Sequence, residues 1–216
     1  HYNRGDDMYH FVGIKGAGMS SLAQIMKELG YNVQGSDVDK HFFTEQGLIE
    51  KGIEFFPYDE NNIKENMKIV KGESIKDDHP EIVKANQLGL DIYSYVEMVG
   101  KLTNKFKTIC VAGCHGKTTT TSMMSLVLNN IKGANYLIGD GTGYAHIDNE
   151  LFVLESCEYK RHFLEYNPYY AVITNIDLDH VDYYKDIDDV IDAYQEFANK
   201  AEKMVIACGD DPYTHS

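Results

Sequence analysis

The sequence has few basic residues, and this shortage excludes several classes of binding protein. It contains 20 Lys and Arg residues against 34 Asp and Glu residues, which gives a formal net charge of -14 at pH 7. A surface with that charge repels nucleic acid and anionic lipid over most of its area. We therefore expect no nucleic-acid partner. An anionic ligand would have to bind in a local pocket built from helix N-termini, a few cationic side chains and metal ions.

The sequence also lacks a paired cysteine motif and a long apolar run. Its cysteines, Cys110, Cys114, Cys157 and Cys208, include no C-x-x-C pair, which favours free thiols in a reducing compartment over a disulfide or metal role. No segment approaches the roughly 18 apolar residues of a membrane span. The N-terminal residues HYNRGDDMYHF contain no apolar signal core. These absences predict a cytoplasmic protein without membrane insertion.

What the chain does have is a regular alternation of short apolar runs and helical patterns, which predicts α/β structure with mainly parallel sheets. The run at 9–14 leads through a glycine-rich turn into a helical pattern that ends at Gly30. The rhythm breaks near residues 102–105, which predicts two domains, 1–104 and 105–216. Further strands are expected at 31–35, 53–56, 67–70, 91–93, 108–112, 136–138, 151–155, 171–174 and 204–208, and further helices at 80–88 and 187–201.

The first of two glycine-rich loops, GIKGAGMSS at residues 13–21, lies between an expected strand and an expected helix. Backbone N–H groups and the helix dipole at such a turn bind a diphosphate. Gly16 and Gly18 match part of the dinucleotide pattern G-x-G-x-x-G, whereas Ser21 replaces its third glycine. Asp37 ends the next strand, where a carboxylate accepts hydrogen bonds from a ribose. The loop predicts phosphate binding without distinguishing NAD from another nucleotide, and a purely structural tight turn is the alternative.

The second loop, VAGCHGKTTTTS at residues 111–122, lacks one glycine of the general pattern G-x-x-x-x-G-K-[ST], because Val111 occupies the first glycine position. It still joins an expected strand to an expected helix and carries Gly116, Lys117 and Thr118 in the order that binds a nucleoside triphosphate. We expect Lys117 to contact the β and γ phosphates and the Thr118 hydroxyl to bind Mg²⁺. A helix capped by threonines is the alternative, but capping leaves Gly116 and Lys117 unexplained.

Two more residues complete the expected metal site. Mg²⁺ bound to phosphates usually takes a protein carboxylate as well. Glu155 ends the apolar strand LFVLE, and His180 follows the next expected strand, in TNIDLDHVD. Each residue alone is more often a surface residue than a ligand. Both, however, lie at carboxyl ends of strands, where doubly wound sheets bind ligands, so we expect them to hold the metal together with Thr118.

Seven ordered segments resemble the Mur ligases, the ATP-dependent enzymes that build the peptide stem of bacterial peptidoglycan. These segments are YHFVGIKGAGMSSLA, NVQGSD, DDHPEIVKA, AGCHGKTTTT, YLIGDGTG, ESCEYKRHFLEY and ITNIDLDHVDYY, and they span nearly the whole chain. The family's loop, G-T-x-G-K-[ST]-[ST], also lacks the first glycine, and Cys114 replaces its commoner Thr. The other departures are Lys15 where many members have Gly, KGES at residues 71–74 where a more apolar or Ser/Asn-containing stretch is common, and Val181 where Pro or Met is usual.

The resemblance implies roles for three groups of residues. The uridine diphosphate end of a sugar nucleotide would be bound by Gly16, Ala17, Gly18, Met19, Ser20 and Asp37, with His115, Arg161 and His162 on the muramoyl side. A surface ion pair is the alternative for Arg161. ATP would be bound by Gly113, Cys114, His115, Gly116, Lys117, Thr118 and Thr119. The catalytic residues would be Lys117, His180 and Glu155, and Mg²⁺ would be held by Thr118, Glu155 and His180.

The implied reaction joins L-alanine to UDP-N-acetylmuramate through an acyl phosphate, with ATP becoming ADP and phosphate. Family members have three domains. The resemblance therefore implies a Rossmann-like UDP-sugar domain, an incomplete P-loop-type ATPase domain and no C-terminal domain, and we expect a truncated chain with little or no activity.

Three alternatives remain open at this stage. A nucleotide-sugar-binding module without catalysis would share the first loop. A recycling ligase acting on the muramoyl tripeptide would share both loops. An NAD-dependent oxidoreductase would leave Lys117, Glu155 and His180 without a role. The oligomeric state and the base that deprotonates the amine are not indicated by the residues.

Overall fold

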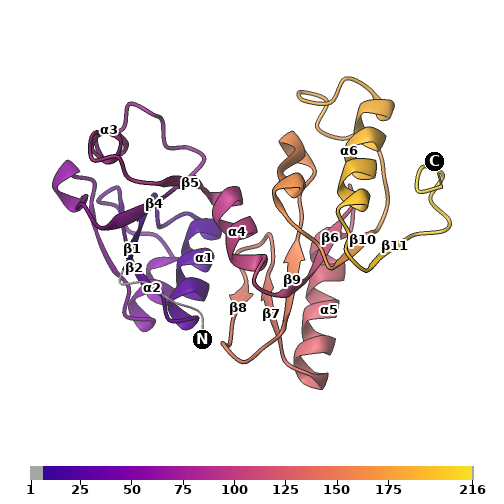
Figure 1. The fold of residues 1–216 in the computed structure, drawn as a ribbon, viewed down its shortest axis with the longest axis horizontal. Coiled ribbons are helices and arrows are strands. Elements are labelled where there is room, and N and C mark those ends of the chain that lie inside the picture. The colour runs from indigo at the N-terminus through magenta and orange to yellow at the C-terminus, as the bar shows by residue number, and fades with distance from the viewer. Residues whose placement is uncertain (1–6, 216) are drawn as a thin grey trace. The chain divides into compact units, whose positions relative to one another are not determined.

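A computed structural model describes residues 7–215 as two compact units (Figure 1). The first unit runs through Met98 and also includes the segment Asp140–Ile147, and the second contains Val99–Gly139 and the chain from Asp148 onward. The division falls inside helix α4 (Tyr95–Thr103). The sequence predicted a division after residue 104 and gave no sign that the segment Asp140–Ile147 would join the first unit, because such a return depends on tertiary contacts.

The first unit is built on a parallel sheet with the strand order β3-β2-β1-β4-β5. The strands are β1 (Met8–Val12), β2 (Asn32–Asp37), β3 (Glu54–Pro57), β4 (Met67–Lys71) and β5 (Ile92–Ser94). The other elements are α1 (Ala17–Glu28), α2 (Glu45–Glu50), η1 (Glu60–Asn62), α3 (Pro80–Gln87) and the start of α4. The strand order reverses between β1 and β4, and doubly wound sheets bind ligands at such a point.

Helices on both faces explain why the central strands are almost continuously apolar. Phe11 and Val12 of β1 have no exposed surface, and neither do Ile69 and Val70 of β4. A strand that is buried on both faces loses the alternation of polar and apolar residues that a half-exposed strand shows. The short apolar runs of the sequence are therefore the parallel strands of the core.

A hydrogen-bonded network of polar side chains also lies in the core of the first unit. His10 of β1, Ser36 of β2 and Glu81 of α3 have no exposed surface. The Glu81 carboxylate lies 2.6 Å from His10 Nε2 and accepts a 2.7 Å hydrogen bond from the Ser36 hydroxyl. A buried carboxylate is stable only with such partners, so the network fixes β1, β2 and α3 against one another.

The second unit is also built on a parallel sheet, and its strands follow the order β11-β10-β6-β9-β7. These strands are β6 (Lys107–Ala112), β7 (Ala134–Leu137), β9 (Leu151–Glu155), β10 (Tyr170–Ile173) and β11 (Met204–Ala207). The helices are α5 (Lys117–Ile131), η2 (Tyr159–Glu165) and α6 (Ile187–Asn199), while the short β8 (Gly143–Tyr144) lies in the segment that clusters with the first unit. The predicted α/β class with mainly parallel sheets is confirmed.

Helix α5 packs on the sheet through one side only. Met124 and Leu128 contact the core, whereas Met123 and Val127 are exposed, because residues one position apart are turned by about 100° around a helix. Within the described residues, no helix combines the length and apolarity that crossing a bilayer requires.

Candidate functional site

The loop between β6 and α5 contains two glycines that the backbone requires. Gly113 has φ 144°, and a Cβ at this position would lie 1.8 Å from Thr174 Oγ1. Gly116 has φ 78° and immediately precedes the first residue of α5. L-residues rarely adopt either conformation, whereas glycine does so at little cost. The two glycines therefore allow the tight turn that leads from the end of β6 into the N-terminus of α5.

Lys117 lies at the first position of α5 and folds back over this loop. Its Nζ donates a 2.7 Å hydrogen bond to the Gly113 carbonyl and lies 3.3 Å from Glu158 Oε2. The first turn of a helix has backbone N–H groups without intrahelical partners, and its dipole favours anions. The ammonium and the helix N-terminus together form a site suited to a phosphate group.

Thr118 and Glu155, two of the predicted metal ligands, contact each other directly. The Thr118 hydroxyl donates to Glu155 Oε1 over 2.8 Å. The other carboxylate oxygen of Glu155 accepts from the Gly139 N–H over 2.5 Å. Mg²⁺ prefers hydroxyl and carboxylate oxygens as ligands. The pair therefore fits that metal by its donor chemistry and by its position beside the phosphate loop.

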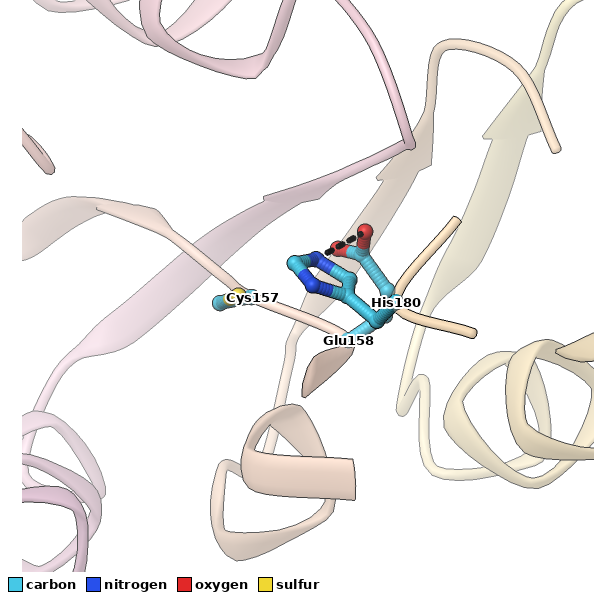
Figure 2. A group of neighbouring side chains, drawn as sticks. All are labelled: Cys157, Glu158 and His180. Carbon is cyan, nitrogen blue, oxygen red and sulfur yellow. Dashed lines mark ion pairs between the residues drawn. The ribbon is translucent and has the colours of Figure 1, made fainter. Parts of the chain in front are cut away.

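His180, the third predicted metal ligand, lies beside a carboxylate that sequence reasoning missed. Figure 2 shows its ring facing Glu158, and its Nε2 lies 3.3 Å from Glu158 Oε1. His180 has φ 53°, a conformation uncommon outside glycine, and such backbone strain clusters at functional sites. The structure thus brings His180 together with Lys117 and Glu158, and Thr118 together with Glu155.

Glu158 is 1% exposed, and neither of its carboxylate oxygens makes a hydrogen bond within residues 7–215. Its ion-pairing neighbours are the Lys117 ammonium and the His180 ring. The ligand atoms of Cys157, Glu158 and His180 all lie within 4.8 Å of one another. Glu158 could have been identified from its position in ESCE. It lies three residues after Glu155, which ends β9, and is therefore also near the carboxyl edge of the sheet.

Cys114, whose role the sequence left open, points into the protein beneath the loop. Its Sγ lies 3.1 Å from the Asp177 N–H nitrogen and 3.8 Å from the Tyr194 hydroxyl, and the residue is 7% exposed. The Cys114 N–H donates to the Asn175 carbonyl. The exposed His115 donates its own N–H to Asn175 Oδ1 over 2.9 Å. Cys114 therefore anchors the loop from below.

Two other predicted residues, Arg161 and His162, lie in η2, which begins directly after Glu158. Arg161 forms ion pairs with α6, at 2.8 Å to Asp189 and 2.9 Å to Glu196, which is the arrangement the sequence left as its alternative to ligand binding. The His162 ring lies 6.3 Å from the ring of Tyr159. Thr119 is exposed on the first turn of α5.

The glycine loop of the first unit is held by Asp37. The carboxylate of Asp37 accepts hydrogen bonds from the N–H groups of Lys15 and Val38, at 2.8 and 2.7 Å. The Lys15 ammonium lies 2.7 Å from the Glu45 carboxylate, and this buried ion pair also stabilises the loop. A pocket of about 210 Å³ lies beside the start of α1 and is lined by Ala17, Ser20, Gln24, Phe43, Thr44, Gly47, Asp140 and Gly141. Gly16 caps α1, Gly18 lies close to Tyr95, and Met19 is buried.

The four cysteines are free thiols that differ in exposure, so their reactivities should differ as well. Burial raises the pKa of Cys110 to about 12, and burial also raises the pKa of Cys114 and of Cys157. A raised pKa leaves less of the reactive thiolate at a given pH, about one part in ten thousand for Cys110 at pH 8. We expect iodoacetamide at pH 8 to label the exposed Cys208 first and Cys110 last. Peptide mass spectrometry would measure the rates, and equal labelling of Cys110 and Cys208 in the folded chain would contradict the burial.

Comparisons with known proteins identify the family and the fold of the chain. The model of the Mur ligase family catalytic domain matches residues 8–107, and that of the Mur ligase middle domain matches residues 111–216. The structure of UDP-N-acetylmuramate-alanine ligase from Thermotoga maritima is 28% identical, with a TM-score of 0.82, over 96% of this chain and 50% of that one.

Two other solved structures share the fold. UDP-N-acetylmuramate:L-alanyl-gamma-D-glutamyl-meso-diaminopimelate ligase from Neisseria meningitides is 24% identical, with a TM-score of 0.81, over 98% of this chain and 74% of that one. A murein peptide ligase from Psychrobacter arcticus is also 24% identical, with a TM-score of 0.78, over 97% and 50% of the two chains. The chain thus spans 50% of the length of two of these three structures.

Proposed function

Because the chain belongs to the Mur ligase family, we propose that it carries the sugar-nucleotide and ATP sites of a ligase that joins L-alanine to UDP-N-acetylmuramate. The observation that carries the proposal is the arrangement at the N-terminus of α5, where Lys117 lies beside the Thr118–Glu155 pair and beside Glu158 and His180. The 28% identity to an alanine ligase supports L-alanine as the amino acid. The proposal includes a cytoplasmic location.

In the proposed reaction, an oxygen of the lactyl carboxylate attacks the γ phosphorus of ATP, and ADP leaves. The amine of L-alanine then attacks the acyl carbon, the C–O bond to phosphate breaks, and the amine loses a proton. The first step brings two anions together, and like unit charges at 4 Å repel by about 4 kcal/mol at an effective dielectric constant of 20. The activation step therefore requires positive charge at the phosphate.

Lys117 and the N–H groups at the start of α5 would supply part of that charge, because both are in position before the substrates bind and form the proposed phosphate site. Thr118, Glu155 and His180 would hold Mg²⁺, which when bound supplies further positive charge to the phosphate oxygens. His115, exposed at the tip of the loop, would face the muramoyl side together with His162. Arg161 either stabilises η2 through its ion pairs with α6 or breaks these ion pairs to bind the muramoyl substrate.

In the first unit, the loop from Gly16 to Ser20 would bind the diphosphate at the N-terminus of α1. Ala17 and Ser20 line the pocket beside that helix, which gives the sugar nucleotide a place to bind. Asp37 holds the loop through the Lys15 N–H and has lone pairs left for a ribose hydroxyl. An NAD enzyme could use this loop, but it would give no role to the phosphate site of the second unit.

The choice of amino acid is tested by product formation. The chain would be incubated at high concentration with ATP, Mg²⁺ and UDP-N-acetylmuramate, together with either labelled L-alanine or labelled L-alanyl-γ-D-glutamyl-meso-diaminopimelate. We expect a small amount of nucleotide product, as fits the low activity expected of this chain. Its label should come from L-alanine, and unlabelled L-alanine should compete with it. Incorporation of the tripeptide in preference to L-alanine would contradict the proposal and would assign the chain to the recycling reaction.

A further inference from the structure

The buried carboxylate of Glu158 contacts two residues that have roles in the function proposed above. Its Oε2 lies 3.3 Å from Lys117 Nζ, and its Oε1 lies 3.3 Å from His180 Nε2. The residue is 1% exposed, and its two oxygens make no hydrogen bond with any described residue. Figure 2 shows its carboxylate turned toward His180. A buried carboxylate in this state is costly unless charged neighbours balance it.

The fold holds Glu158 in this position from more than one side. Its backbone carbonyl accepts a 2.5 Å hydrogen bond from the buried Tyr184 hydroxyl. Lys160 and Arg161, which follow it, adopt left-handed conformations with φ 51° and 57°. Strained backbone of this kind persists only where the surrounding structure enforces it. The backbone around Glu158 is therefore fixed, and it places the carboxylate next to Lys117 and His180.

The charge of Glu158 opposes the binding of a bare polyphosphate. With Glu158 present, the ammonium of Lys117 is balanced before any ligand arrives, and an incoming phosphate meets a carboxylate as well as a cation. Charges a few ångströms apart in a partly buried site interact strongly because water screens them poorly. If a divalent cation were bound together with the phosphates, its charge would offset that of the carboxylate, and Glu158 would then favour binding instead of opposing it.

We propose that Glu158 is a positioning and charge-balancing residue that makes nucleotide binding depend on a divalent cation. It acts through Lys117 and His180, by holding them in place in the empty site and by cancelling the charge that would otherwise trap a metal-free polyphosphate. This inference rests on the proposed ATP site in the second unit. The site would therefore bind the nucleotide–metal complex more tightly than the free nucleotide.

The test compares affinities with and without metal. Calorimetry would give the Kd of a nonhydrolysable ATP analogue, and of inorganic tripolyphosphate, for the chain and for Glu158→Gln, in Mg²⁺ and in EDTA. We expect the substitution to lower the Kd about tenfold in EDTA and to raise it about tenfold in Mg²⁺, because an unbalanced Lys117 attracts the bare anion and the cation loses a favourable neighbour. Glu158→Asp keeps the charge and should keep most of the dependence on Mg²⁺.

Glu81→Gln is the matched control, because Glu81 is another fully buried glutamate paired with a histidine, in the first unit. It should lower the thermal stability and leave both nucleotide affinities unchanged. A Glu158→Gln chain with the wild-type ratio of affinities would overturn the inference. So would a wild-type chain that binds tripolyphosphate equally well in Mg²⁺ and in EDTA, a result that does not depend on the folding of any variant. Failure of the wild-type chain to bind the ATP analogue at all would instead overturn the proposed function.

Discussion

Replacing Lys117 by alanine is expected to lower the affinity for a nonhydrolysable Mg²⁺–ATP analogue about a hundredfold or more, and to leave UDP-N-acetylmuramate binding unchanged. The substitution removes the ammonium that folds over the phosphate loop and leaves the Glu158 carboxylate with one charged neighbour fewer. Charge-assisted hydrogen bonds to phosphate are among the stronger polar contacts, and an unpaired buried carboxylate adds a further penalty. A hundredfold loss corresponds to about 2.7 kcal/mol.

Calorimetric titration of each ligand would measure this effect. Lys132→Ala is a suitable control, because Lys132 follows the other end of α5 and its side chain is 62% exposed. It should leave both affinities unchanged. Loss of both ligands in Lys117→Ala would mean that the roles assigned to the two units are wrong. If Lys117→Ala bound the ATP analogue with unchanged affinity, Lys117 would not be part of the nucleotide site.

Replacing Gly113 by alanine is expected to destabilise the second unit and to abolish binding of the ATP analogue. The new Cβ would lie 1.8 Å from Thr174 Oγ1, the atom that donates a 2.7 Å hydrogen bond to the His115 carbonyl. Relief of this overlap would move the loop or Thr174, and the left-handed φ adds about 1–3 kcal/mol of backbone strain. We expect the unfolding midpoint to fall by several degrees, at roughly 2–8 °C for each kcal/mol.

Differential scanning calorimetry, together with nucleotide titration, would test this. Gly209→Ala is the control, because a Cβ at Gly209 would meet no atom within 4 Å. It should change neither the midpoint nor the affinity. A Gly113→Ala chain that matches Gly209→Ala in both measurements would show that the turn tolerates a side chain, and the account of the loop would then be wrong.

The fold was largely predictable because strong local signals determine it. Runs such as LFVLE are buried on both faces and bounded by turn residues, so the strand at 151–155 was expected with the bounds observed for β9. The contact between Thr118 and Glu155 followed from a general rule, since the carboxyl ends of neighbouring parallel strands meet at one edge of the sheet. These features depend on residue types and periods that can be read directly from the sequence.

The parts of the site that were missed depend on tertiary structure. Glu158 precedes η2, and its carbonyl accepts a hydrogen bond from Tyr184, which lies 26 residues further along the chain. Lys160 and Arg161 of η2 adopt left-handed conformations, although neither is a glycine. The inward direction of Cys114 likewise depends on Asp177, which follows a different strand. Interactions between residues far apart in the chain leave little trace in a single sequence.

The central claim is that the chain binds a sugar nucleotide and ATP at two separate sites. Calorimetric titration tests this claim most directly. The chain would be titrated with UDP-N-acetylmuramate and, separately, with a nonhydrolysable ATP analogue in Mg²⁺, with NADH as the competing ligand for the first site. We expect one site for the sugar nucleotide, one site for the ATP analogue, and no binding of NADH. Binding of NADH in place of UDP-N-acetylmuramate, or binding of the sugar nucleotide without the ATP analogue, would contradict it.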